Sequence, residues 1–160
     1  MKDAGLNYHT KLSKRAEFNS FNYFITENYD AGTEAYTYVG QSTSSKNRFF
    51  SINNLMCYMN NGVLSINTGF DKAKKDFLFG NIISHKKILQ TYASANYKHF
   101  VSNSISLQTG LTYDYQSNIF DDLIPLYFYA QSPSSPNYQQ TTDISNHNIE
   151  AYLYSTWKLT

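Results

Sequence analysis

The chain has 160 residues, 17% of them aromatic, and its 13 Lys and Arg against 12 Asp and Glu leave a net charge of +1. This balance offers nothing that predicts a nucleic-acid partner. A mean hydropathy of −0.50 excludes a helical membrane protein, and no apolar run approaches the roughly 18 residues that a spanning helix needs. The chain has 1 cysteine, Cys57, so no intrachain disulfide can form.

The N-terminal part predicts two weakly patterned β-strands. The first covers Leu6 to Leu12 and ends at the polar turn Ser13-Lys14-Arg15. In the second, Phe21, Tyr23 and Ile25 alternate with polar residues and Phe24. Because alternation places successive side chains on opposite faces of a sheet, this run is typical of a strand.

The clearest pattern is a β-hairpin over residues 48–70. Apolar and polar residues alternate up to Tyr58, and again from Leu64 to Phe70. The tripeptide Asn60-Asn61-Gly62 separates the two runs. An Asn-Gly pair between alternating runs predicts a tight turn, in which both residues tolerate positive φ.

A second hairpin covers residues 89–115. Residues 89–97 alternate up to a short turn near Lys98 to Asn103, and residues 105–115 form the most regular period-2 run of the chain. A last alternating strand runs from Asn148 to Leu159. The sequence predicts about seven strands in all.

The connections between these hairpins are expected to be long. They span roughly Glu27 to Lys46, Asp71 to His85 and Ser117 to Asn146, and the charged run 71–76 is interpreted as a hairpin tip. Short and long connections therefore alternate along the chain. The predicted fold is an all-β, antiparallel, up-and-down meander of about seven long strands whose sheet stays open.

Strand length, an uncharged polar face and alternating loop lengths together indicate an outer-membrane β-barrel. Eleven residues tilted by about 40° rise about 28 Å, which is close to a bilayer core. Short turns would face the periplasm and long loops the outside. The residues predicted to face lipid on the convex side are Leu64, Ile66, Leu107, Leu111, Ile149 and Leu153. The predicted aromatic girdles comprise Tyr58, Tyr97 and Trp157 near the periplasmic strand ends, and Tyr113 and Tyr115 toward the outer ends.

Three stretches resemble the barrels of TonB-dependent receptors of Gram-negative bacteria. They are LQTGLTYDY at 107–115, DDLIPLY at 121–127 and NIEAYLYSTWKL at 148–159. The resemblance implies a barrel of about 22 strands, an N-terminal plug domain, the TonB complex as partner, and import of a scarce chelate, vitamin or oligosaccharide. Neither plug nor TonB-binding segment is recognised, so residues 1–160 are expected to form a partial barrel domain in the bacterial outer membrane.

The sequence gives no sign of an enzyme, a cofactor or a metal site. His9, His85, His99 and His147 lack ligand spacing, and the acids at 114, 121 and 122 are interpreted as solvated loop residues. The aromatic run Tyr127, Phe128 and Tyr129, in the longest predicted outer loop, is a candidate ligand contact. Two alternatives stay open: a small complete outer-membrane barrel with a structural or adhesive role, and a soluble barrel that binds a ligand inside.

Overall fold

The computed structural model describes residues 1–35, 38–127 and 136–158. These residues form seven β-strands: β1 (Lys2–Ser13), β2 (Ala16–Ala35), β3 (Tyr38–Met59), β4 (Gly62–Phe79), β5 (Ile82–Phe100), β6 (Ile105–Pro125) and β7 (Asn137–Trp157). Within the described ranges, no helix is long and apolar enough to cross a membrane.

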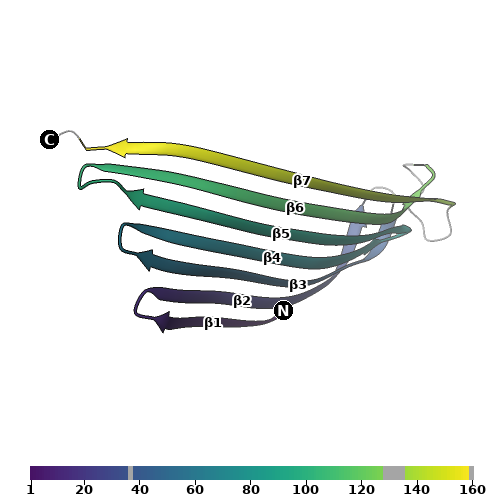
Figure 1. Ribbon diagram of the computed structural model, residues 1–160. Helices are drawn as coiled ribbons and strands as arrows, with labels where there is room; N and C mark the ends of the chain where they lie inside the picture. The colour runs from purple at the N-terminus through teal and green to yellow at the C-terminus, as the bar shows by residue number, and fades with distance from the viewer. Residues whose placement is uncertain (36–37, 128–135, 159–160) are drawn as a thin grey trace.

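The strands form one antiparallel sheet in the order β1 to β7, so each strand pairs with its sequence neighbour (Figure 1). This confirms the predicted meander. β1 and β7 lie at opposite edges and do not pair with each other over the described residues, so the sheet is open. The short turns predicted at 13–15, 60–62 and near 98–103 are found at residues 14–15, 60–61 and 101–104, and all three lie at the same end of the sheet.

The predicted long connections are largely wrong, because most of their residues continue the strands. β2 extends to Ala35 and β3 starts at Tyr38, while β4 and β5 are joined by Gly80 and Asn81 alone. The charged run 71–76, expected at a hairpin tip, lies inside β4 and pairs with residues 85–90 of β5. Charged residues on both faces hide the alternation there, but backbone pairing with two neighbouring strands does not depend on side-chain polarity.

The two tight turns reach their geometry differently. Gly80, with φ 60°, is the only described residue in the left-handed region, and glycine adopts it at little cost. Neither Asn61 nor Gly62, the pair predicted to form the turn, has positive φ, so that part of the turn prediction is wrong, and the turn residues are Asn60 and Asn61. Gly62 pairs with Met59, and a Cβ atom added there would lie 2.7 Å from the Lys98 carbonyl oxygen of β5. Close approach of backbone therefore requires glycine at this position.

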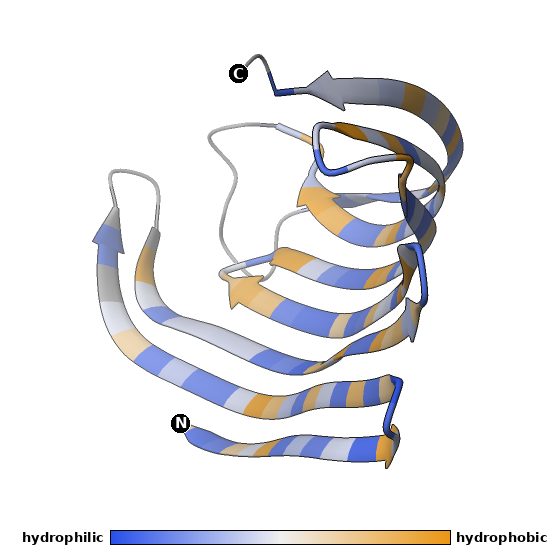
Figure 2. Ribbon diagram, turned by 60° about the vertical axis from the view of Figure 1, so that its left-hand side comes forward, coloured by the Kyte–Doolittle hydropathy of each residue, from blue (hydrophilic) through white to orange (hydrophobic). Residues whose placement is uncertain are grey.

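The sheet curves around one of its faces (Figure 2). In β4 the odd-numbered residues 63–73 are half-buried or buried, whereas the even-numbered residues 66–74 are exposed. The odd-numbered side chains of β4 therefore point to the concave face, where side chains converge. Ala73, 5% exposed, is the only buried apolar residue in the described part of the chain. Over the described residues the sheet thus has no packed core of its own, whereas globular domains bury a sheet face against a second layer.

Candidate functional site

The strands differ in character along their length, between a near half and a far half. The near half adjoins the three short turns and ends at the cross-strand row Ser51, Phe70, Thr91, Tyr115 and His147. The far half is the remainder. The convex side of the near half is called the apolar band.

All six residues predicted to face lipid lie on the convex face within the apolar band. Directly paired residues of antiparallel strands point to the same face. Leu64 pairs with Tyr97, which pairs with Thr109, which pairs with Leu153. The next such row contains Ile66 and Leu111, and the flanking rows contain Leu107 and Ile149. Leu153, 76% exposed, shows how little of this surface the chain itself covers.

Four of the five residues predicted for aromatic girdles share this convex face. Tyr97 and Trp157 lie toward the short turns, while Tyr113 and Tyr115 lie near the middle of β6 at the far edge of the apolar band. Tyr58 pairs with Val63 and points to the concave face. It therefore cannot belong to the same girdle as the other four.

The concave face of the near half carries a hydrogen-bonded polar ladder. His9 Nδ1 lies 2.6 Å from Asn19 Oδ1, and the Asn19 amide donates to Asn54 Oδ1 at 3.4 Å. Asn54 donates to Asn67 Oδ1 at 2.7 Å, and Asn67 donates to Ser94 Oγ at 3.1 Å. Ser94 is 4% exposed. Five strands, β1 to β5, are thus linked by side chains as well as by backbone.

The ladder continues to β7 through an unusual step over β6. The Tyr152 hydroxyl donates to Asn96 Oδ1 at 2.6 Å, although Tyr152 is on β7 and Asn96 on β5. Gly110 of β6 lies between them, and a Cβ atom there would be 2.5 Å from both the Tyr152 ring and Asn96 Oδ1. Gln108 then donates to the Tyr152 hydroxyl and accepts from the Tyr154 hydroxyl. The glycine makes room for this crossing.

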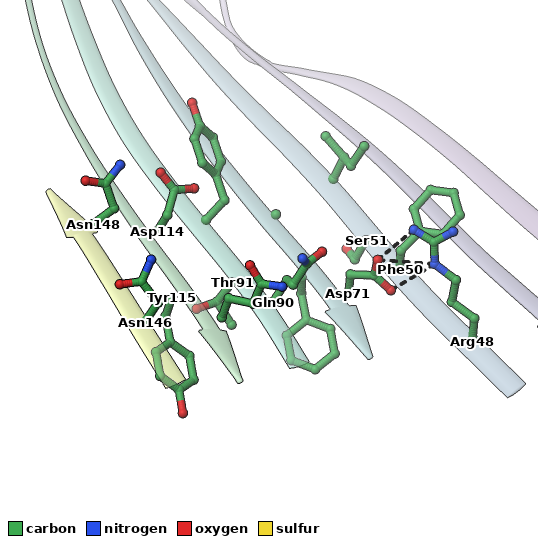
Figure 3. A pocket seen from close by; sticks show the side chains of 15 residues that line it. Arg48, Phe50, Ser51, Asp71, Gln90, Thr91, Asp114, Tyr115, Asn146 and Asn148 are labelled. Carbon is green, nitrogen blue, oxygen red and sulfur yellow. Dashed lines mark hydrogen bonds and ion pairs between the residues drawn. The ribbon is translucent and has the colours of Figure 1, made fainter. Parts of the chain in front are cut away.

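A hollow of about 560 Å³ lies beside the ladder on the concave face (Figure 3). On one side, Arg48 holds Asp71 with two donors, and its Nη2 is 2.6 Å from Asp71 Oδ2. On the other side, Asp114 and Asn148 project from β6 and β7. Phe50, against which Arg48 stacks at 5.2 Å, is among the lining residues. The hollow thus combines an aromatic surface with groups that donate and accept hydrogen bonds.

The predicted aromatic contact cannot be placed as a unit. Tyr127 is exposed and follows the end of β6, while Phe128 and Tyr129 lie outside the described residues. The hollow instead lies on the strands, well before this segment in β6. Sequence reasoning missed it because its lining residues come from five different strands, β3 to β7.

The His and Asp residues considered for metal binding are dispersed. Asp114, Asp121 and Asp122 lie on β6 rather than in a loop, and Asp121 points to the opposite face from the other two. Over the described ranges, no cluster of three or more His, Cys, Asp or Glu residues is arranged to hold a metal ion.

His85 belongs to an ion-pair cluster on the convex face of the far half, beyond the apolar band. Its Nδ1 is 2.6 Å from Asp76 Oδ1, and Lys74 Nζ is 3.0 Å from Asp76 Oδ2. The hydrogen bond from His85, followed by the one from Lys74, lowers the pKa of the Asp76 carboxyl below its ordinary value. This part of the convex face is thus charged and polar, unlike the apolar band.

No protein-family model, characterised protein or solved structure matches this chain.

Proposed function

We propose that the chain forms part of the wall of an outer-membrane transport barrel, with the apolar band against lipid and the concave face toward a hydrated interior. One observation carries the proposal: in the near half of β4 to β7, the large apolar side chains are mostly on the convex face, and the concave face holds a continuous polar ladder. In β2 and β3 the concave face also carries Phe21, Ile52 and Met56 beside the ladder. A soluble barrel that binds a ligand inside would have the opposite arrangement, with its apolar side chains on the concave face.

The dimensions of the apolar band support this placement. In β4 the near half covers residues 62–70, and nine residues at about 3.3 Å each, tilted by about 40°, rise about 23 Å. Outer-membrane barrels carry an apolar band about 25 Å tall. The far half would then project beyond the bilayer into water, which accounts for charges on its convex face.

The open sheet favours a wall segment over a small complete barrel. A complete barrel requires the first and last strands to pair, because lipid offers no partner for a free strand edge. β1 and β7 instead lie at opposite edges. The further assignment to a TonB-dependent receptor that imports a scarce nutrient rests on the resemblance of residues 107–115, 121–127 and 148–159, and on the aromatic and polar hollow.

Solubility in detergent tests the membrane part of the proposal. We expect the chain to aggregate in buffer, because it exposes a broad apolar face and two strand edges, and to give a β-rich circular dichroism spectrum in nonionic micelles. A monodisperse monomer without detergent, measured by analytical ultracentrifugation, would contradict the proposal.

The flanking coding sequence tests the receptor part. A plug domain, a TonB-binding segment and further barrel strands in the same reading frame are expected. A reading frame that continues into an unrelated soluble domain would rule out the receptor assignment. The detergent experiment would still test whether the apolar band contacts lipid.

A further inference from the structure

Three lysines lie side by side on the concave face of the far half. Lys46 of β3 pairs directly with Lys75 of β4, and Lys75 pairs directly with Lys86 of β5. These three residues are called the lysine row. Like charges directly opposite on neighbouring strands destabilise a sheet. Their adjacency therefore costs stability, and a bound anion would offset this cost.

The chain itself compensates only part of this charge. Lys46 Nζ is 3.3 Å from Glu27 Oε2. Lys86 Nζ lies 4.5 Å from the centre of the Phe120 ring, and neither Lys75 nor Lys86 has a carboxylate within 4.0 Å in the described part of the chain. Asp122, one residue pair further along this face, accepts a hydrogen bond from Ser84.

The lysine row lines a hollow of about 300 Å³, together with Arg48, Asp71 and neutral donors including Gln90 and Gln116. Around this smaller hollow, Arg48 and the three lysines meet two carboxylates, Asp71 and Glu27, so two positive charges are in excess there. Asp122 and, in the larger hollow, Asp114 offset part of this excess. Arg48, Asp71, Gln90 and Gln116 also line the larger hollow. The two hollows therefore adjoin, and one molecule can occupy both.

We infer that the lysine row binds the anionic group of a small solute carrying two or more carboxylate or phosphate charges, whose body lies in the adjoining aromatic hollow. Half-buried Lys46 and Lys86 are less screened by water than the exposed lysines of the convex face. Partly desolvated cations hold anions through charge-assisted hydrogen bonds. This inference extends the proposed function, since it names the class of solute that a transport barrel would admit.

Titration calorimetry with citrate and with pyrophosphate tests the inference, using the full chain in dodecyl maltoside micelles at fixed ionic strength. We expect saturable binding of at least one anion, and a loss of about tenfold in affinity for Lys75→Gln/Lys86→Gln. The matched control is Lys72→Gln/Lys87→Gln, which removes the same charge from the same two strands on the convex face. The control should bind like the unmodified chain.

Three results would overturn the inference. They are absence of saturable binding for both anions, equal losses in the two double variants with an unchanged circular dichroism spectrum, and preference for a polyglutamate peptide over both small anions. A preference for citrate or for pyrophosphate identifies the carboxylate or the phosphate as the group bound. Binding of an anion by the lysine row does not depend on lipid contact. If the membrane proposal fails, the chain is a detergent-free monomer that can still bind the anion, whereas if this inference fails, the chain needs detergent and binds neither anion.

Discussion

The two halves of β4 show how one strand can be built for two surroundings. Residues 62–70 contain no charged side chain, whereas five of the nine residues 71–79 are charged. In the first segment polar and apolar residues take opposite faces, and in the second Lys72, Lys74 and Asp76 charge the convex face as well. The backbone pairing is continuous across both. Pairing alone thus builds the strand, and side chains determine which medium each half can face.

The largest effect should come from placing a charge in the apolar band. Leu111→Arg should lower the free energy of unfolding from phospholipid vesicles by about 2–4 kcal/mol, because the guanidinium would face hydrocarbon. Ile119→Arg, on the same face of the same strand but in the far half, should cost about 0–1 kcal/mol. Urea titrations followed by fluorescence measure both. Equal losses would remove the distinction between the halves.

A smaller effect is expected where the ladder crosses β6. Gly110→Ala should cost about 1–3 kcal/mol, since the new methyl group meets the Tyr152 ring and Asn96 Oδ1. Gly32→Ala is the matched control, because a Cβ atom at Gly32 meets nothing within 4 Å. Adding Tyr152→Ala to Gly110→Ala should recover part of the loss. Additive losses in the double variant would show that the glycine does not make room for the ring.

The two faces of the near half predict effects of different size for neighbouring asparagines. Asn54→Ala removes donations to Ser65 and Asn67 on the concave face and should cost about 1–2 kcal/mol. Asn53→Ala, on the convex face, removes longer donations to Ser51 and Thr68 but also takes a polar group out of the apolar band, so it should cost less stability in vesicles than Asn54→Ala. The same urea titrations compare them. A larger loss for Asn53→Ala would reverse the assignment of the faces.

The smallest effect concerns the ion pairs of the far half. The pKa of Asp76 is lower in the folded than in the unfolded chain. Its carboxylate therefore stabilises the sheet fully at pH values above the unfolded-state pKa, and this contribution is lost as the pH falls through the folded-state pKa. Asp76→Asn should therefore cost a few tenths of a kcal/mol near neutral pH, and the difference from the unmodified chain should vanish in acid. If the two chains still differ in unfolding free energy at the lowest pH, the Asp76 carboxylate charge is not the cause of the difference.

The near half could be predicted because its alternation is visible in the sequence. The hairpins at 48–70 and 89–115 are confirmed, and parity alone placed Leu64 and Leu111 on a common face. Parity also separates Tyr58 from Tyr97, which share a strand end but not a face. Position along a strand was thus an insufficient criterion for the girdle.

The far half could not be predicted, because charges on both faces remove the periodic signal. The run from Lys72 to Asp76 has the composition of a turn, and its pairing with residues 85–89 of β5 is a property of two segments together. The lysine row and the hydrogen bond from Tyr152 to Asn96 could not be predicted either, because each joins residues of different strands. Such features depend on register across strands, which composition does not encode.

The single native cysteine allows the most direct test of lipid contact by the apolar band. Cys57 pairs with Leu64 and shares its convex face, while Ser65 lies on the concave face. A fluorophore on Cys57, in vesicles with brominated acyl chains, should be quenched by lipid and protected from aqueous iodide. In a Cys57→Ser chain carrying Ser65→Cys, the fluorophore should show the reverse. Quenching by iodide at both positions, with no lipid quenching at Cys57, would contradict the account.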